Sequence, residues 1–125
     1  MKRIIETDLA PKAIGAYSQA IEKNGILFIS GQIAINPETG KLIQGGIKEQ
    51  TDQVLKNVEA ILEKAGYTFA DVIKSTCLLN NIKDFAEMNE IYSNYYQIYH
   101  PARAAFGGVD LPLGALVEIE TIAVK

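Results

Sequence analysis

The segment Ile47–Ala65 constrains the fold more than any other part of this sequence. Its apolar residues recur at helical spacing, with charged and polar residues between them: Ile47, Val54, Leu55, Val58, Ile61, Leu62 and Ala65. This spacing predicts an amphipathic helix with one buried stripe. Gly66 follows at the position where a left-handed C-terminal cap belongs, so we expect the helix to end there.

A second helix is predicted from Asp84 to Tyr99. Its apolar residues also fall three and four positions apart: Phe85, Met88, Ile91, Tyr92, Tyr95, Tyr96 and Tyr99. Asp84 or Asn81 could cap the start of this helix, and Pro101 shortly after its end stops it.

The rest of the chain carries strand signals. Tyr17–Glu22 and Ile26–Ser30 flank Asn24-Gly25, a dipeptide typical of tight hairpins. Further strands are expected on either side of the turn Asn36–Gly40 and in three later segments: Gln32–Ile35, Leu42–Ile43, Val72–Leu79, Arg103–Asp110 and Val117–Val124. We expect the last two strands to form a hairpin. The pattern predicts an α+β fold, one sheet with two helices on one face.

Length and composition place limits on the function. A chain of 125 residues is expected to form a single domain, residues 1–125, because domains are typically about 100–150 residues long. The formal net charge of −3 argues against a protein that mainly grips nucleic acid. One cysteine and one histidine cannot build a zinc site alone, and no phosphate-binding glycine motif occurs. We therefore expect no metal and no cofactor.

The location of the protein is predicted from what its sequence lacks. The N-terminal residues turn acidic and contain a proline before any apolar run as long as that of a signal peptide. No apolar run reaches the length of a membrane-spanning helix. We expect a soluble cytoplasmic protein.

Two residues that often act in catalysis have a simpler explanation here. Cys77 lies in the middle of a predicted strand among apolar neighbours, which favours a buried structural thiol. His100 lies between a tyrosine-rich helix end and a proline, where a favourable charge at the helix C-terminus or plain exposure is the better explanation.

Arg103 is the most informative single residue. No other charged residue occurs from Pro101 to Val109, so small and apolar residues surround its guanidinium. An arginine in such surroundings needs an anionic partner. The partner could be Glu118 or Glu120 in a structural ion pair, or the carboxylate of a ligand held by two parallel hydrogen bonds. These residues alone leave both explanations open.

Glu118 and Glu120 are two positions apart on a predicted strand, so both point to one face of the sheet. A solvated sheet face would explain them equally well. Structural explanations are also available for Tyr17 as a core aromatic residue, for Ser30-Gly31 as a strand end, and for Asn89 as a polar residue on the exposed side of the second helix.

Four segments together resemble the signature of the YjgF/Rid family: Ile14–Ala20, Ser30–Ile33, Pro101–Arg103 and Leu116–Ala123. The two predicted helices also fit, so the resemblance covers nearly the whole chain. It implies a chorismate-mutase-like α+β fold, a homotrimer with sites at subunit interfaces, and hydrolysis of reactive 2-imino acids to 2-keto acids and ammonia. The imino acids implied are 2-iminobutanoate and 2-iminopropanoate, which pyridoxal-phosphate enzymes release.

The resemblance also implies roles for individual residues. Arg103 would hold the substrate carboxylate, and Glu118 would position and activate the attacking water. The remaining implied residues line the pocket or fix the anion through backbone amides: Tyr17, Ser30, Gly31, Asn89 and Ala105. Ala105 stands where many members of the family have a cysteine, so a thiol is not essential at this position.

The chemistry agrees with these roles, since an imine is already electrophilic and needs only an oriented carboxylate and one activated water. In a regular hairpin centred near Leu113-Gly114, Arg103 and Glu118 of one chain would lie about 20 Å apart along the sheet. We therefore expect the site to be shared between subunits. Two other functions stay open: a regulatory module that binds keto or imino acids without turnover, and a translation-inhibiting endoribonuclease.

Overall fold

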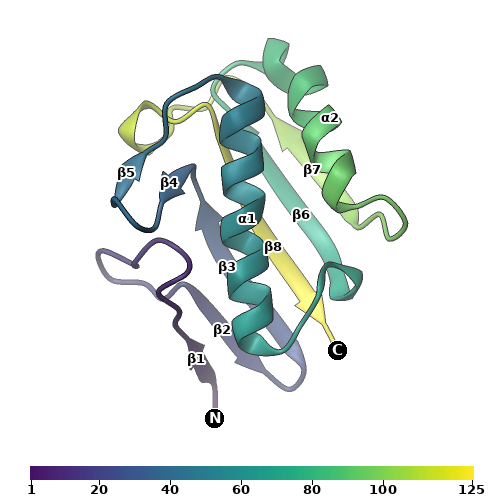
Figure 1. Cartoon of the computed structure of the whole chain (residues 1–125). Helices are drawn as coiled ribbons and strands as arrows, with labels where there is room; N and C mark the ends of the chain where they lie inside the picture. The colour runs from purple at the N-terminus through teal and green to yellow at the C-terminus, as the bar shows by residue number, and fades with distance from the viewer.

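The structure, a computed structural model, describes residues 1–125 as a mixed β-sheet with both long helices on the same face (Figure 1). The sheet has six strands in the order β1-β2-β3-β8-β6-β7. Its strands are β1 (Arg3–Ile5), β2 (Ala20–Lys23), β3 (Ile26–Gln32), β6 (Val72–Leu79), β7 (Ala102–Phe106) and β8 (Val117–Val124). The helices are α1 (Ile47–Ala65) and α2 (Phe85–Tyr95), and β4 (Ile35–Asn36) pairs with β5 (Lys41–Leu42) in a separate small sheet. The predicted α+β architecture is confirmed.

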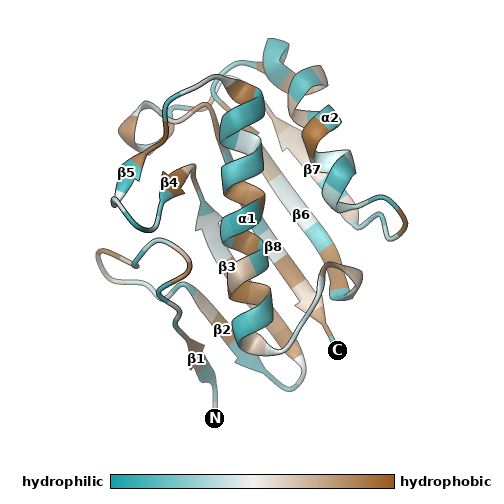
Figure 2. Ribbon diagram, viewed as in Figure 1, coloured by the Kyte–Doolittle hydropathy of each residue, from teal (hydrophilic) through white to brown (hydrophobic).

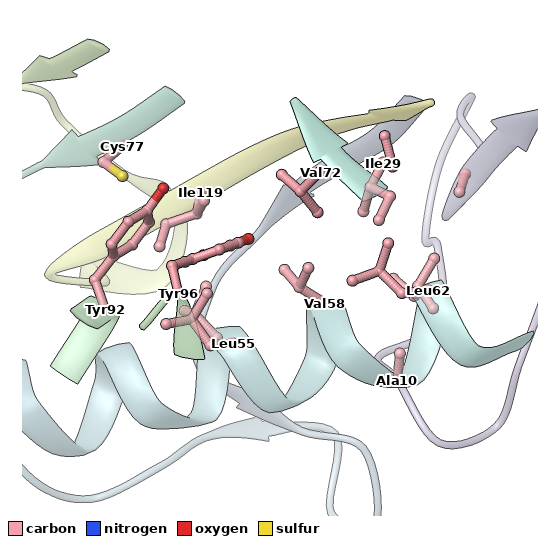
Figure 3. Packing of buried hydrophobic residues seen from close by; sticks show 14 of the residues in the cluster. Ala10, Ile29, Leu55, Val58, Leu62, Val72, Cys77, Tyr92, Tyr96 and Ile119 are labelled. Carbon is pink, nitrogen blue, oxygen red and sulfur yellow. The ribbon is translucent and has the colours of Figure 1, made fainter. Parts of the chain in front are cut away.

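Helix α1 has the predicted bounds. Gly66 caps its C-terminus with φ 85° and ψ 25°, a left-handed conformation that costs glycine little. The hydrophilic residues of α1 lie on the side turned away from the sheet (Figure 2). On the other side Val54, Leu55 and Val58 are completely buried, and Figure 3 shows Leu55 and Val58 packed toward the sheet. None of the helices is long and apolar enough to span a bilayer.

The first predicted hairpin is confirmed at its turn and shifted at its start. Asn24 and Gly25 have φ values of 52° and 76°, as a two-residue turn between β2 and β3 requires. Strand β2 begins at Ala20, so Tyr17 lies in the loop before it and is not part of the strand. The short strand β1 pairs with β2 and was not predicted from the sequence.

Helix α2 is shorter than predicted and ends at Tyr95 instead of Tyr99. Tyr96 leaves the helical conformation with φ −117° and ψ 52°. Its side chain is 1% exposed and packs edge-on against the ring of Phe69. Burial of this ring turns the chain before Pro101 is reached. Asn81 caps the short 3-10 helix Ile82–Asp84 and not α2, since its side-chain oxygen accepts a hydrogen bond from the Lys83 backbone N–H.

The predicted hairpin of Arg103–Asp110 with Val117–Val124 is wrong. Strand β7 runs parallel to β6 at the edge of the sheet, while β8 is antiparallel to both β3 and β6. The reason is the β6-α2-β7 unit, because a helical crossover returns the chain parallel to the strand that it left. The separation of Arg103 and Glu118 estimated from the sequence assumed this hairpin. That estimate therefore does not apply.

Candidate functional site

Glu118 projects from the face of the sheet that no helix covers. Strand β8 alternates strictly, with Val117, Ile119 and Thr121 buried beneath the helices. Glu118 and Glu120 point the other way, as predicted, with Glu118 half-buried and Glu120 exposed. Partial burial raises the pKa of Glu118, and the negative charge of Glu120 raises it further. Glu118 is therefore a carboxylate that keeps a proton more readily than one in water.

A β-bulge in β3 makes room for this carboxylate. Ile29 pairs with Thr121 and Gln32 pairs with Ile119, so Ser30 and Gly31 together lie opposite the single residue Glu120. A Cβ atom on Gly31 would collide with the carboxylate of Glu118. Only glycine at this position allows Glu118 to lie against the backbone of β3.

The loop that carries Tyr17 is fastened to the same region. The amide of Gln19, which is 2% exposed, accepts a hydrogen bond from the Thr7 N–H at 2.8 Å and donates one to the Pro11 carbonyl at 2.8 Å. The Ser30 hydroxyl donates to the carbonyl of Ser18 at 2.6 Å. Ser30 thus supports the loop as well as facing the cleft.

These elements enclose a cleft of about 580 Å³, named here the Glu118 cleft. It brings together four of the predicted site residues: Tyr17, Ser30, Gly31 and Glu118. The other lining residues are mostly apolar or uncharged: Pro11, Lys12, Ile14, Gln19, Gln32, Ile33, Ile35, Pro112, Leu113 and Glu120. The arrangement can hold a water on a carboxylate beside an apolar wall.

Arg103 lies in β7 with its side chain against α2. Its Nη1 donates a hydrogen bond of 2.7 Å to Oδ1 of Asn89. The guanidinium carbon lies 4.8 Å from the ring centroid of Tyr92 and 5.2 Å from that of Phe85. Both distances are within the range of cation–π contacts. A neutral amide and two aromatic rings hold the guanidinium and leave its remaining donors free.

No ion pair satisfies Arg103 within the chain. The three ion pairs of the structure join Arg3 to Glu22, Lys48 to Glu90 and Lys56 to Asp52. The structural pairing of Arg103 with Glu118 or Glu120, left open by the sequence, is therefore wrong for one chain. The hollow of about 400 Å³ beside Arg103 has no acidic residue in its lining, which consists of Asn89, Tyr92, Ser93, Tyr96, His100, Pro101 and Arg103. It is suited to an anion.

The two halves of the predicted site lie on opposite faces of the sheet. Arg103 pairs with the fully buried Ser75 and shares its helix-covered face. Glu118 pairs with Leu78 on the uncovered face. Ala105 pairs with Cys77 on the helix side, packs against the core, and lines neither hollow. Within one chain, Arg103 and Glu118 cannot contact the same small molecule.

Cys77 is a buried structural thiol, as predicted. It is completely buried, and burial raises the pKa of its thiol to about 11. Figure 3 shows it pointing into the core beside Tyr92. His100 is exposed and lies beyond the end of α2, at the edge of the Arg103 hollow.

The aromatic residues that hold Arg103 were not predicted as site residues from the sequence. Phe85 and Tyr92 were assigned only to the apolar period of the second helix, and Asn89 either to its exposed side or, through the resemblance, to the pocket. Phe85, Asn89 and Tyr92 are four and three positions apart, so they lie on one face of α2. That spacing can be read from the sequence. The strand that packs against this face of α2 cannot.

Replacing Asn89 by alanine tests whether its hydrogen bond orients the Arg103 guanidinium. The 2.7 Å hydrogen bond to Nη1 is lost while both rings stay, so the guanidinium gains freedom. We expect weaker binding of a small carboxylate anion in this hollow, on the order of tenfold in Kd, with little change in thermal unfolding. Calorimetric titration measures the affinity, and Ser93→Ala on the same helix is the control. Unchanged affinity in Asn89→Ala would show that the rings alone orient Arg103.

Comparison with known proteins places the chain in a family. The family model described as Endoribonuclease L-PSP matches residues 7–125. The chain belongs to this family, the YjgF/RidA family. Members similar to the chain include a RutC family protein of Pyrococcus horikoshii, 54% identical over 100% of this chain and 99% of that protein.

Another similar member of the YjgF/RidA family is the rat protein named 2-iminobutanoate/2-iminopropanoate deaminase, 47% identical over 100% of this chain and 91% of its own length. Among solved structures, a putative endoribonuclease from Thermotoga maritima superposes with a TM-score of 0.98 at 50% identity, covering 100% of this chain and 98% of that one. The predicted family and fold class are thereby confirmed. Names within the YjgF/RidA family differ, so family membership supports deaminase activity in general and assigns no roles to individual residues.

Proposed function

We propose that this chain hydrolyses the reactive 2-imino acids 2-iminobutanoate and 2-iminopropanoate to 2-oxo acids and ammonia. The observation that carries the proposal is the guanidinium of Arg103, which has no acidic partner and is held by Asn89, Phe85 and Tyr92 in a hollow without carboxylates. Such a site is ready for a ligand carboxylate, the group that all 2-imino acids carry. The deaminase name of the rat relative is consistent with it.

In this proposal Arg103 binds the carboxylate and orients C2 of the substrate. Tyr17, Ser30, Gly31 and Asn89 line or support the site, and backbone amides near Gly31 help to hold the anion. Glu118 holds a water and accepts its proton as the oxygen adds to C2 and the C=N π electrons move to nitrogen. With the protonated imine as the reacting form, this gives a neutral carbinolamine. Glu118 then returns its proton to the amino nitrogen, the C–N bond breaks, and ammonia leaves. The remaining hydroxyl gives up its proton to form the 2-oxo acid. The overall reaction consumes one water and needs no oxidant, metal or organic cofactor.

The proposed reaction requires more than one copy of the chain. Because Arg103 and Glu118 face opposite sides of one sheet, a substrate that meets both must lie between two subunits. We propose a homotrimer, in which each Glu118 cleft receives Arg103 of a neighbour, and a closed ring repeats the site three times.

An apolar row on the uncovered sheet face supports the self-association. Cross-strand pairing places Ile4 beside Ile21, Ile21 beside Phe28, and Phe28 beside Ile122. Ile4 and Phe28 are 58% and 50% exposed. A row of this kind, continuous over four strands, is a surface that a second copy would cover.

Mixing two inactive variants tests the shared site. Arg103→Ala and Glu118→Ala proteins, unfolded and refolded together, should regain part of the wild-type activity, because mixed trimers contain some interfaces with both residues intact. Native mass spectrometry confirms that mixed trimers form, and each variant refolded alone is the control. Mixed trimers without activity would show that each site is built within one chain.

The activity itself is tested by coupling this protein to a threonine or serine dehydratase while semicarbazide traps free imine. Faster 2-oxo acid formation and less semicarbazone are expected. A protein that binds 2-oxo acids but leaves both quantities unchanged would be a regulatory module. Whether the protein is an endoribonuclease, as some of its relatives are named, is tested by incubating metal-free preparations with RNA. Arg103→Ala is the control.

A further inference from the structure

The Glu118 cleft has an apolar side that the proposed hydrolysis does not use. Water activation needs only the carboxylate end, but the cleft volume of about 580 Å³ is in the range of pockets for much larger ligands, roughly 300–1,000 Å³. The apolar side chains that line it come from three separate parts of the chain, the loop before β2, the segment from the end of β3 into β4, and the 3-10 turn before β8: Ile14, Ile33, Ile35 and Leu113. An apolar wall next to a reacting carboxylate is suited to an apolar part of the same substrate.

Leu113 has the least favourable backbone of these residues. Its φ of 59° and ψ of 18° lie in the left-handed region, which a branched side chain rarely adopts. The turn around it fixes this conformation, since Pro112 precedes it, Gly114 follows with φ 70°, and the Ala115 N–H donates to the Pro112 carbonyl at 3.1 Å. Glycine or asparagine would fit the same backbone with less strain. Strained residues of this kind cluster at functional sites.

The strain is not offset by burial. Leu113 is 69% exposed and Ile14 is 86% exposed, so neither side chain gains much from the core of its own chain. Both nevertheless line the cleft that holds Glu118. Because Leu113 is strained and mostly exposed in its own chain, we expect its main contact to lie outside that chain.

We propose that Leu113, together with Ile14, forms the subsite that binds the side chain of the imino acid and favours branched or extended apolar side chains. The subsite rests on the proposed function, because it places the reacting C2 at Glu118. The other possible contact is a neighbouring subunit, which the experiment below separates from the substrate.

The test compares hydrolysis of imino acids made in place by an L-amino-acid oxidase from alanine, 2-aminobutyrate and leucine, with semicarbazide as the trap. Leu113→Gly keeps the backbone conformation and removes the side chain. We expect it to lower the ratio of kcat/KM for the leucine-derived imine over the alanine-derived imine on the order of tenfold. Leu113→Met, which keeps an apolar chain, should retain most of the ratio. Leu9→Ala removes another exposed leucine, outside the cleft, and is the control.

The outcomes are distinguished by two further measurements, native mass and the affinities of 2-oxo-4-methylpentanoate and pyruvate. A lower ratio with unchanged mass supports the subsite. An unchanged ratio overturns it, and loss of the trimer in Leu113→Gly with an unchanged ratio assigns Leu113 to the subunit contact. If no imine is hydrolysed, the proposed function fails, and the ratio of the two affinities still decides the subsite. Equal loss of both affinities, or binding of neither acid, overturns the subsite.

Discussion

Replacing Arg103 by alanine is expected to lower kcat/KM for imine hydrolysis on the order of a hundredfold or more. The guanidinium is the only arginine or lysine group in the lining of its hollow. A charge-assisted pair with two parallel hydrogen bonds is about twice as strong as a neutral pair. Most of the loss should appear in the affinity for 2-oxobutanoate. Steady-state kinetics with the trapped-imine assay and calorimetric titration measure the two effects.

Arg3→Ala is the matched control, because Arg3 is the only other arginine and its removal changes the net charge equally. Arg103→Lys should restore only part of the activity, since an ammonium lacks the planar fork. Thermal unfolding of Arg103→Ala should stay near that of the wild type, because Arg103 is exposed and forms no ion pair in the chain. Near-native kcat/KM in Arg103→Ala would contradict the carboxylate-binding role.

Replacing Glu118 by glutamine is expected to reduce kcat on the order of a hundredfold or more while 2-oxobutanoate still binds. Glutamine keeps the shape against Gly31 but cannot accept the proton of water. In the wild type, activity should rise with pH through the raised pKa of Glu118, above its ordinary value of 4.5. Single-turnover kinetics across pH measure this limb, which the variant should lack. Glu120→Gln is the control on the same face and should retain most of the activity.

The same substitution should make the protein more stable at neutral pH. Since burial raises the pKa of Glu118 in the folded state, the folded protein binds this proton more tightly than the unfolded chain does. The wild type therefore loses stability as pH rises from below 4.5 through the raised pKa, whereas Glu118→Gln does not. The difference in Tm between variant and wild type should widen over that interval. A variant that loses binding and turnover equally, without this gain, would make Glu118 a structural residue.

The sequence by itself determined the elements whose causes are local. Helix α1 and its glycine cap follow from periodicity and from a single left-handed position, and the Asn24-Gly25 turn follows from dihedral preference. The alternation of β8 put Glu118 and Glu120 on one face, because successive side chains of a strand always point to opposite faces. The four segments that carry the family resemblance are likewise a property of the sequence.

The end of α2 and the place of β7 were decided by tertiary structure. The apolar period continues to Tyr99, but burial of Tyr96 against Phe69 turns the chain earlier. Strand β7 has the composition of a hairpin partner for β8, yet the α2 crossover delivers it parallel to β6. Neither the end of α2 nor the position of β7 can be predicted from local spacing, because each depends on which surfaces other elements already bury.

The separation of Arg103 from Glu118 shows the same division most clearly. From the sequence, a site shared between subunits was expected because of a hairpin distance that the structure contradicts. The proposed sharing rests instead on the positions of Arg103 and Glu118 on opposite faces of the sheet. Strand alternation assigns a side chain to a face only relative to its own strand. Which face the helices cover, and which strand lies beside β7, is set by packing of the whole chain. For this reason tertiary structure alone placed Arg103 against Phe85, Asn89 and Tyr92, and Glu118 against Gly31.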